Sequence, residues 1–312
     1  MANLPLASDM SFGWMTVMSN QQETRSAVTM AEELGLDSLW VGDHIAFAVP
    51  MLDPFVQLAQ AAAHSTKLTF GTSVYLLPLR HPTPVAKQVA TLDHLTDGKL
   101  IFGVGVGGEF PNEYAACGVP VKERGARMSE GISVLKKLWS GETVNNDSGR
   151  FFPFPDVQML PPPVQKGGPP VWCGGRSAAA LRRTGRMADG WISYVVTPEM
   201  YKKALDDIAK AAEEEKRQID NFGTGHLLFF RIDDKFEDAW DHATKHLTTR
   251  YAMDFREAAK KYCALGPPAD VAARINEFRE AGVRHIVLDP TGPHRERETQ
   301  IERFAKEVRP LL

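Results

Sequence analysis

Short apolar runs alternate with amphipathic stretches along most of this 312-residue chain. An apolar run followed by a helical pattern predicts a βαβ unit, and repeats of that unit predict a parallel sheet. Eight repeats in a chain of this length are typical of a TIM (β/α)8 barrel. We therefore expect an α/β fold with strands at Ser11–Val17, Asp37–Val41, Leu68–Val74, Leu100–Val106, Pro170–Cys173, Gly190–Val195, Leu227–Ile232 and His285–Leu288.

The amphipathic stretches predict the helices that would surround such a barrel. They carry apolar residues at helical spacing, and several open on a proline or stop before a glycine, which are common helix boundaries. Two of these helices would lie between the seventh and eighth strands. The expected helices are Gln22–Leu34, Pro54–His64, Pro84–Leu95, Ser129–Trp139, Ser177–Met187, Glu199–Lys216, Glu237–Tyr251, Ala269–Glu280 and Arg295–Val308.

Residues 143–169 interrupt this alternation after the fourth βα unit. Polar turn formers at 145–149 precede aromatic residues and prolines at 151–163, which predicts a small hairpin and an extended connection. Long loops in compact domains often act as lids, but such a segment could equally cover the flank of the barrel. We expect a single barrel domain, residues 1–312, that carries this insertion.

Composition and charge exclude several classes of function. A hydrophobic content of 43% supports one large core, and a net charge of −3 gives no affinity for nucleic acid or anionic membranes. The chain opens without a signal-peptide pattern and has no apolar run long enough to span a bilayer, so we expect a cytoplasmic protein. Its three cysteines are widely spaced, which indicates free thiols.

Candidate catalytic and binding residues follow the second and third runs. A TIM barrel places its chemistry on the loops that leave the carboxyl ends of its strands. Asp43 and His44 follow the second run, and a histidine there can act as a general acid or base, or can simply bond to backbone. Small residues around Ser73 and Val74 would admit a planar ligand, although ordinary packing explains them as well.

Two glycine-rich turns follow the fourth and fifth runs. The stretch 103–108 fits G-x-G-x-x-G, but no helix opens immediately after it, so it is not a dinucleotide fingerprint. Its glycines would let the backbone pass close to a bound ring and would leave Glu109 and Asn112 in the barrel mouth. Gly174–Ser177 leads into a predicted helix, and the free N–H groups at the start of that helix suit a phosphate, to which Arg176 would add positive charge. Alternatively, the segment is only a tight turn and the Arg176 side chain is solvated.

Metal chemistry is not expected from this sequence. His242 and His246 lie four residues apart on one predicted helix, but the glutamate of a metalloprotease motif is absent between them. No serine-centred nucleophile motif is present either. With metal and serine-nucleophile chemistry set aside, redox chemistry with a bound organic cofactor is the class of function that remains.

These motifs together resemble the luciferase-like superfamily of flavin and deazaflavin oxidoreductases, whose fold is a TIM barrel. Each motif alone is weak, but their order and spacing along nearly the whole chain are specific. The matching segments are Gly71–Val74, Arg80–Pro82, Ala86–Gln88, Leu92–Asp93, Asp97–Lys99, the glycine run at 103–108, Glu113, Gly118, Glu123–Arg124, Glu130, Leu138–Trp139, Pro162–Gln165, Pro170–Gly175, Ala188–Trp191, Gly266 and Ala281–Val283.

The resemblance implies a cofactor site and a catalytic pair. The ring of the cofactor would rest on a bulge with a non-prolyl cis peptide at Ser73–Val74. The turn at Gly174 and Gly175, with the adjacent Ser177 and Ala178, would bind the cofactor phosphate. Branches that use coenzyme F420 carry an Asp-His pair after strand two, as here, and the segment 109–113 is similar to a branch in which His and Glu move protons during hydride transfer. The residues so implicated are His44 and Glu109 as catalytic, and Asp43, Ser73, Val74, Asn112, Gly174, Gly175, Arg176, Ser177 and Ala178 as cofactor-binding.

Departures from the sugar-phosphate branch of that family argue against a sugar phosphate as the substrate. A tryptophan after the histidine and a lysine after strand six are replaced here by Ile45–Ala48 and Val195–Pro198. Five side chains suggest an aromatic-lined pocket for a hydrophobic substrate, unless they merely pack the barrel. They are Phe47, Tyr75, Leu77, Phe110 and Tyr194.

Three functions follow from the resemblance. The first is F420-dependent hydride transfer to or from a small hydrophobic substrate. The second is an FMN-dependent monooxygenase that uses reduced flavin, supplied by a flavin reductase, and oxygen. The third is a non-catalytic flavin-binding protein. The resemblance also implies a homodimer.

Overall fold

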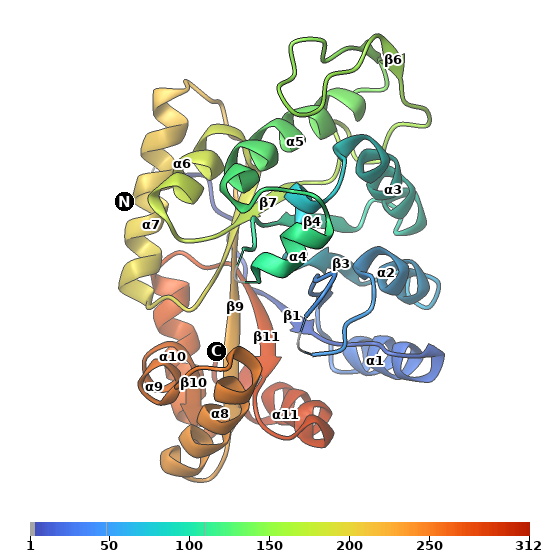
Figure 1. Ribbon diagram of the computed structural model, residues 1–312. Coiled ribbons are helices and arrows are strands. Elements are labelled where there is room, and N and C mark those ends of the chain that lie inside the picture. The colour runs from blue at the N-terminus through green and yellow to red at the C-terminus, as the bar shows by residue number, and fades with distance from the viewer. Residues whose placement is uncertain (1–3, 48, 109) are drawn as a thin grey trace.

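The strands close into a parallel β-barrel. A computed structural model describes residues 4–47, 49–108 and 110–312. Among these residues, eight parallel strands pair in chain order; β11 closes on β1, and β9 pairs with both β8 and β11 (Figure 1). Every predicted apolar run forms one of them. The strands are β1 (Ser11–Met15), β2 (Ser38–Val41), β3 (Thr69–Thr72), β4 (Leu100–Val104), β7 (Val171–Gly174), β8 (Gly190–Tyr194), β9 (Gly223–Ile232) and β11 (His285–Pro290).

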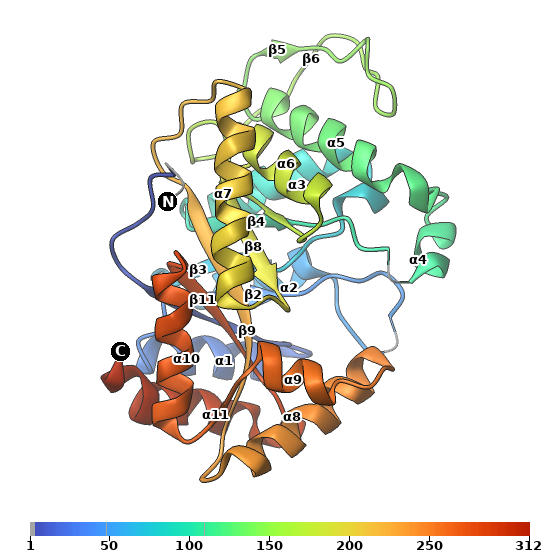
Figure 2. The same cartoon turned by 90° about the vertical axis from the view of Figure 1, so that its left-hand side faces the viewer.

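Helices surround this barrel and cover the outer faces of its strands, as the two views in Figures 1 and 2 show. The predicted helices are all present, and four of them open with proline in the first turn, where the missing N–H costs nothing. They are α1 (Gln21–Glu33), α2 (Pro54–Ala62), α3 (Pro82–Leu95), α5 (Arg124–Leu138), α6 (Ala178–Met187), α7 (Pro198–Glu214), α8 (Phe236–Tyr251), α10 (Pro268–Glu280) and α11 (Arg297–Arg303).

Three short elements were not predicted. Helix α4 (Pro111–Ala116) follows the glycine run, and helix α9 (Arg256–Tyr262) with strand β10 (Ala264–Gly266) lies between α8 and α10. Strand β10 pairs with the end of β9 outside the closed ring. Elements of three to seven residues are too short to show a helical or strand period, so the sequence pattern gave no signal for them.

The insertion between α5 and β7 forms a small antiparallel pair and packs on helices. Strand β5 (Thr143–Val144) pairs with β6 (Val157–Gln158), at the top of Figure 2. The Glu130 carboxylate of α5 accepts hydrogen bonds from the amides of Phe151 and Phe152, and Asp93 of α3 accepts from the amide of Gln165. These contacts hold the segment against α3 and α5; its action as a lid stays a prediction.

Two tryptophan side chains fill the interior of the barrel. The rings of Trp40 on β2 and Trp172 on β7 lie with their centres 5.7 Å apart. Glycines on other strands of the barrel make room for them: an added Cβ would lie 2.4 Å from the Trp40 ring at Gly71 of β3 and 2.2 Å from the Trp172 ring at Gly223 of β9. Because the interior is packed like an ordinary core, space for a ligand begins at the carboxyl ends of the strands.

Candidate active site at the carboxyl ends of the strands

The turns predicted to form the site lie at one end of the barrel. Asp43 and His44 follow β2, Ser73 and Val74 follow β3, and Gly174 ends β7. In a closed parallel barrel all carboxyl ends face the same side, so these turns share one mouth. A Cβ atom at Gly174 would lie 3.0 Å from Cγ1 of Val74, which places the β3 and β7 turns in contact.

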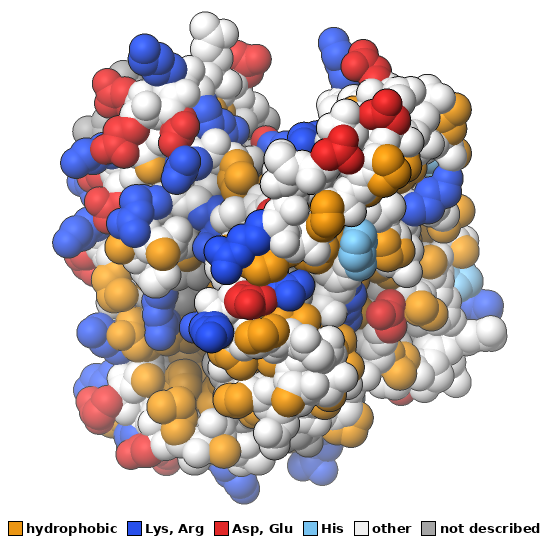
Figure 3. Space-filling view, turned by 45° about the horizontal axis from the view of Figure 1, so that its top comes forward, with side chains coloured by type: hydrophobic (Ala, Val, Ile, Leu, Met, Phe, Trp, Pro, Cys, Tyr) orange, Lys and Arg blue, Asp and Glu red, His pale blue; other side chains and the backbone are white. Residues whose placement is uncertain are grey.

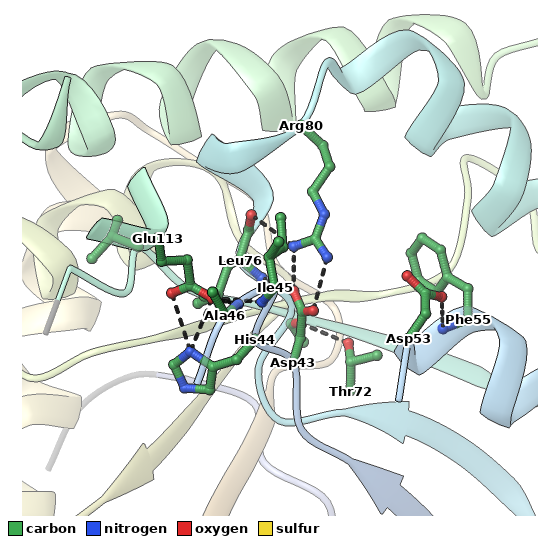
Figure 4. A network of polar contacts seen from close by, with 12 residues as sticks. Asp43, His44, Ile45, Ala46, Asp53, Phe55, Thr72, Leu76, Arg80 and Glu113 are labelled. Atoms are coloured by element: carbon green, nitrogen blue, oxygen red, sulfur yellow. Dashed lines mark hydrogen bonds and ion pairs between the residues drawn. The ribbon is translucent and has the colours of Figure 1, made fainter. Parts of the chain in front are cut away.

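The His44 ring is oriented by a buried carboxylate. Glu113 of α4 is 1% exposed, and its Oε2 lies 3.1 Å from Nδ1 of His44 (Figure 4). The same carboxylate accepts backbone hydrogen bonds from Ile45 at 2.5 Å and from Ala46 at 3.2 Å. An ionised carboxylate only accepts, so Nδ1 donates its proton to Glu113. Within the described part of the chain, Nε2 of His44 has no hydrogen-bond partner and is the nitrogen available for proton exchange.

Two phenylalanines flank the imidazole. The Phe47 ring stacks on His44 with 4.2 Å between ring centres and an interplanar angle of 7°, and Phe110 meets both rings edge-on. The predicted aromatic lining is therefore only partly right. Tyr75 and Leu77 are 2% and 1% exposed and belong to the core, where Tyr75 stacks on Phe55 outside the barrel.

Asp43 forms a buried ion pair that joins the β2 and β3 turns. Its side chain is fully buried, and Oδ1 accepts from Nη2 of Arg80 at 2.8 Å while Oδ2 pairs with Nη1. Oδ2 also accepts from the amide of Leu76 at 2.8 Å. Burial acts to lower the pKa of the Arg80 guanidinium, but its hydrogen bonds and charge attraction with Asp43 outweigh burial and raise that pKa. Asp43 thus fixes the backbone that carries His44 against the Ser73–Val74 turn.

The Val74 side chain fits between glycines of two other strands. The Ser73–Val74 peptide is cis, as the family resemblance implies. A Cβ atom at Gly105 would lie only 2.3 Å from Cγ2 of Val74, and one at Gly174 would lie 3.0 Å from Cγ1. The sequence analysis assigned the glycine run at 103–108 to the approach of a ring and Gly174 to a phosphate; the structure adds that the Val74 side chain needs Gly105 and packs closely on Gly174.

The turn after β7 has open backbone N–H groups. Gly175 has φ near +99°, and Ser177 caps α6 through a hydrogen bond that its Oγ accepts from the amide of Ala180 at 3.2 Å. The amides of Ala178 and Ala179 begin the helix and have no partner among the described residues. Arg176 donates instead to the carbonyl of Val195 at 2.7 Å and so joins this turn to the end of β8.

A cluster of two arginines and one aspartate lies at the end of β11. Asp289 is 1% exposed and accepts from Arg250 of α8 at 2.9 Å and from Arg297 of α11 at 2.8 Å. The Arg250 guanidinium also lies over Phe229 of β9, with 30% of the side chain exposed. Two guanidiniums share one carboxylate, so this side of the mouth keeps excess positive charge.

The remaining predicted residues have mixed outcomes. Glu109 lies outside the described residues. Asn112 is exposed on α4, next to the buried Glu113. Sequence reasoning gave no separate role to Glu113, Arg80 or Arg250. Only the family motifs carried a signal for the first two, since both lie far in the chain from His44 and Asp43.

Comparison with known proteins agrees with this geometry. TIM barrels carry many chemistries, and a histidine held by a buried carboxylate at the barrel mouth suits acid–base work in several of them. A family model described as luciferase-like monooxygenase matches residues 9–285. The chain belongs to this luciferase-like family.

Curated relatives and solved structures span the whole fold. The phthiodiolone/phenolphthiodiolone dimycocerosates ketoreductase of Mycobacterium tuberculosis is 33% identical, with 85% of this chain and 86% of the relative covered. The F420-dependent glucose-6-phosphate dehydrogenase of Amycolatopsis mediterranei is 27% identical over 90% of this chain and 92% of its own. An F420-dependent secondary alcohol dehydrogenase, solved with an F420-acetone adduct, superposes with a TM-score of 0.85 at 18% identity and covers 97% of this chain and 99% of its own.

Within the described residues, no helix has both the length and the apolar character needed to cross a bilayer.

Proposed function

We propose that this protein catalyses hydride transfer between coenzyme F420 and a hydrophobic alcohol or ketone. The observation that carries this proposal is the contact between His44 and the buried Glu113 at the barrel mouth. Interconversion of an alcohol and a ketone moves one proton at the substrate oxygen as well as one hydride. An imidazole with Nδ1 held by a carboxylate leaves Nε2 to accept or give that proton near neutral pH.

The residues at the β3 and β7 turns fit a deazaflavin and its phosphate. Val74 presents an apolar side chain between Gly105 and Gly174, against which a planar ring can rest. The amides of Ala178 and Ala179 at the start of α6 suit the phosphate, because a helix amino end carries partial positive charge. When bound, the deazaflavin supplies or accepts the hydride. Asp43, through Arg80 and Leu76, holds the β2 loop that presents His44.

A hydrophobic substrate is supported by the surroundings of His44. Phe47 and Phe110 flank its ring. The loop that carries His44 exposes three large apolar side chains, with exposed fractions from 44% to 48%; these are Ile45, Val49 and Leu52. The chemistry of two relatives' substrates, a dimycocerosate ketone and a secondary alcohol, points the same way.

Cofactor titration tests the proposal. The purified protein would be titrated separately with F420 and with FMN, followed by fluorescence, and then assayed without oxygen for F420 reduction by a panel of alcohols that increase in apolar size. We expect F420 binding, and F420 reduction that improves with apolar size. Binding of FMN alone, with substrate-dependent oxygen consumption when a flavin reductase supplies reduced flavin, would replace this proposal with the monooxygenase function. Cofactor binding without any turnover would support the non-catalytic reading.

The oligomeric state is a second, separate proposal. We infer a homodimer, as the family resemblance implies. Sedimentation equilibrium of the full chain would measure its mass, and a mass near 34.5 kDa at all concentrations would show a monomer instead.

A further inference from the structure

A basic groove runs along the outside of the barrel from the predicted phosphate site. It lies between α5 and α6 and forms a surface hollow of about 520 Å³. Small residues, among them Gly125, Ser129 and Ala179, form its floor near the amino ends of both helices, and three arginines of α6 border it. Ala179 belongs to both the groove and the first turn of α6, so the groove begins where the cofactor phosphate would lie.

Among the described residues, two of the three arginines of this groove pair with no carboxylate, and the third pairs with Glu215, which also lines the groove. Arg182 is exposed and forms no ion pair with any described residue. Arg183 donates to Oγ of Ser129 at 3.0 Å and to the carbonyl of Gly125 at 3.1 Å; burial lowers the pKa of its guanidinium. Arg186 pairs with Glu215 at 2.7 Å, but both are well exposed, and such surface pairs hold little free energy.

The positive charge continues beyond Arg186. A second hollow of about 480 Å³ shares Arg186 and Met187 with the first and adds Lys136, Lys137 and Arg217. From the first residue of α6 to Arg186 the helix rises about 12 Å. Acidic side chains lie among the basic ones on the face of the molecule drawn in Figure 3. Lys136 and Arg217 share the carboxylate of Asp189, at 2.8 and 3.9 Å, and Arg186 pairs with Glu215. The two hollows together therefore keep an excess of basic side chains and are not a single point charge.

We propose that this groove binds the oligoglutamate tail of coenzyme F420, an inference that rests on the function proposed above. In this cofactor the phosphate links the ribityl chain of the deazaflavin to a lactyl group and a chain of glutamates, each with a free carboxylate. A phosphate at the amides of Ala178 and Ala179 directs the tail outward along α6. The carboxylates then meet Arg182 first and Arg186 further along. FMN ends at its phosphate and has nothing to place in the groove.

Binding by exposed guanidiniums has a characteristic dependence on salt. Exposed charge pairs weaken as ionic strength rises, because the Debye length falls from about 10 Å at 0.1 M to about 3 Å at 1 M. Exposed charge pairs are individually weak. We expect loss of two arginines to weaken binding of the tail about 5- to 10-fold and to leave binding of the ring and phosphate intact.

The test compares two forms of the cofactor on two double variants. Dissociation constants for F420 with a long glutamate tail and for the form that ends at the lactyl group would be measured by fluorescence at low and high salt. The variant Arg182→Ala with Arg186→Ala removes groove charge and leaves Arg183, which joins α5 to α6. The control Arg25→Ala with Lys166→Ala removes two exposed cations elsewhere, on α1 and in the insertion.

The expected result is a tail-dependent gain in affinity. The long form should bind the wild type and the control about 5- to 10-fold more tightly than the short form at low salt, and the groove variant should lose this gain. Equal affinity of both forms for the wild type, or a gain that persists in the groove variant, would overturn the tail site while leaving the proposed function intact. Failure of both forms to bind would instead overturn the proposed function, and this inference with it.

Discussion

Oε2 of Glu113, a residue buried on α4, lies 3.1 Å from Nδ1 of His44, which follows β2. The two residues are 69 positions apart in the chain. Their contact fixes the ring so that Nε2 is the nitrogen free to exchange a proton. Glu113 acts through His44 and is a positioning residue in the proposed reaction.

Separate replacements of His44 and Glu113 should distinguish the residue that transfers the proton from the residue that positions it. His44→Ala should lower kcat about 10²- to 10⁴-fold, the usual contribution of a general acid–base, with the cofactor dissociation constant unchanged. Glu113→Gln should lower kcat less, because a neutral amide holds the Nδ1 proton of His44 less firmly, and Glu113→Asp should recover part of the loss. The measurement is steady-state kinetics of each variant, with cofactor titration as the control. An unchanged kcat for Glu113→Gln would remove the positioning role.

The Asp43–Arg80 pair should contribute strongly to stability. Asp43→Asn leaves a largely buried guanidinium without its counter-charge, and breaking buried pairs in this way costs about 3–5 kcal/mol of unfolding free energy. Urea unfolding measures this loss. Arg80→Gln and the double variant complete a mutant cycle, in which the double variant should lose less than the sum of the two single losses. Additive losses would show that the pair is not coupled.

A side chain at position 105 should disturb the Val74 turn. In Gly105→Ala the new methyl group would lie 2.3 Å from Val74 Cγ2, so one of the two must move. We expect roughly 1–3 kcal/mol of destabilisation and weaker cofactor binding. Val74→Ala in the same chain removes the clash and should restore most of the stability, measured by urea unfolding. No recovery in this double variant would contradict the packing that the structure shows.

Arg250 should affect substrate binding more than turnover. Arg250→Met keeps the apolar length over Phe229 and removes one of two cations on Asp289, and Arg297 remains to pair with that carboxylate. For a substrate whose polar group contacts Arg250 at the barrel mouth, KM should rise about tenfold and kcat should stay nearly constant. The reason is that an interaction made equally in the ground state and the transition state affects KM and not kcat. Steady-state kinetics decides this, with Arg256→Met on α9 as the control. A fall in kcat alone would place Arg250 in the chemical step.

Two buried histidines should make the protein sensitive to acid. Burial lowers the pKa of His226 to about 3, aided by the charge of Arg274, and burial lowers the pKa of His285 to about 4. Both folded-state pKa values lie below the unfolded value of about 6.5. At a pH between the folded and unfolded values, the unfolded chain therefore binds more protons than the folded chain. Stability is then complete above about pH 6.5 and falls by about 1.4 kcal/mol per pH unit for each histidine as the pH drops toward 4.

Urea unfolding at several pH values checks this slope. His226→Gln should reduce it by about half, whereas substitution of the exposed His64 should leave it unchanged. A slope that is the same in the His226 variant and the wild type would show that the buried histidine does not drive the acid sensitivity.

The sequence by itself determined the barrel, its eight strands and most of its helices. Helices buried on one face show a helical period, and strands buried on both faces appear as short apolar runs. Both patterns are readable without knowing the partner element. The family motifs also indicated the cis peptide at Ser73–Val74 and the turn at Gly174–Ser177. Short elements such as α4 and β10 gave no period and were missed.

Only the tertiary structure decided which distant residues meet. Closure of the ring and the register of its strands bring Glu113 to His44, Arg80 to Asp43, and Gly105 to Val74. Tyr75 shows the same limit: its pattern suited a ligand pocket as well as a core, and only the packing of Phe55 against it placed it in the core. A one-dimensional pattern records that a side chain is buried, whereas the identity of its neighbour depends on how the whole barrel closes.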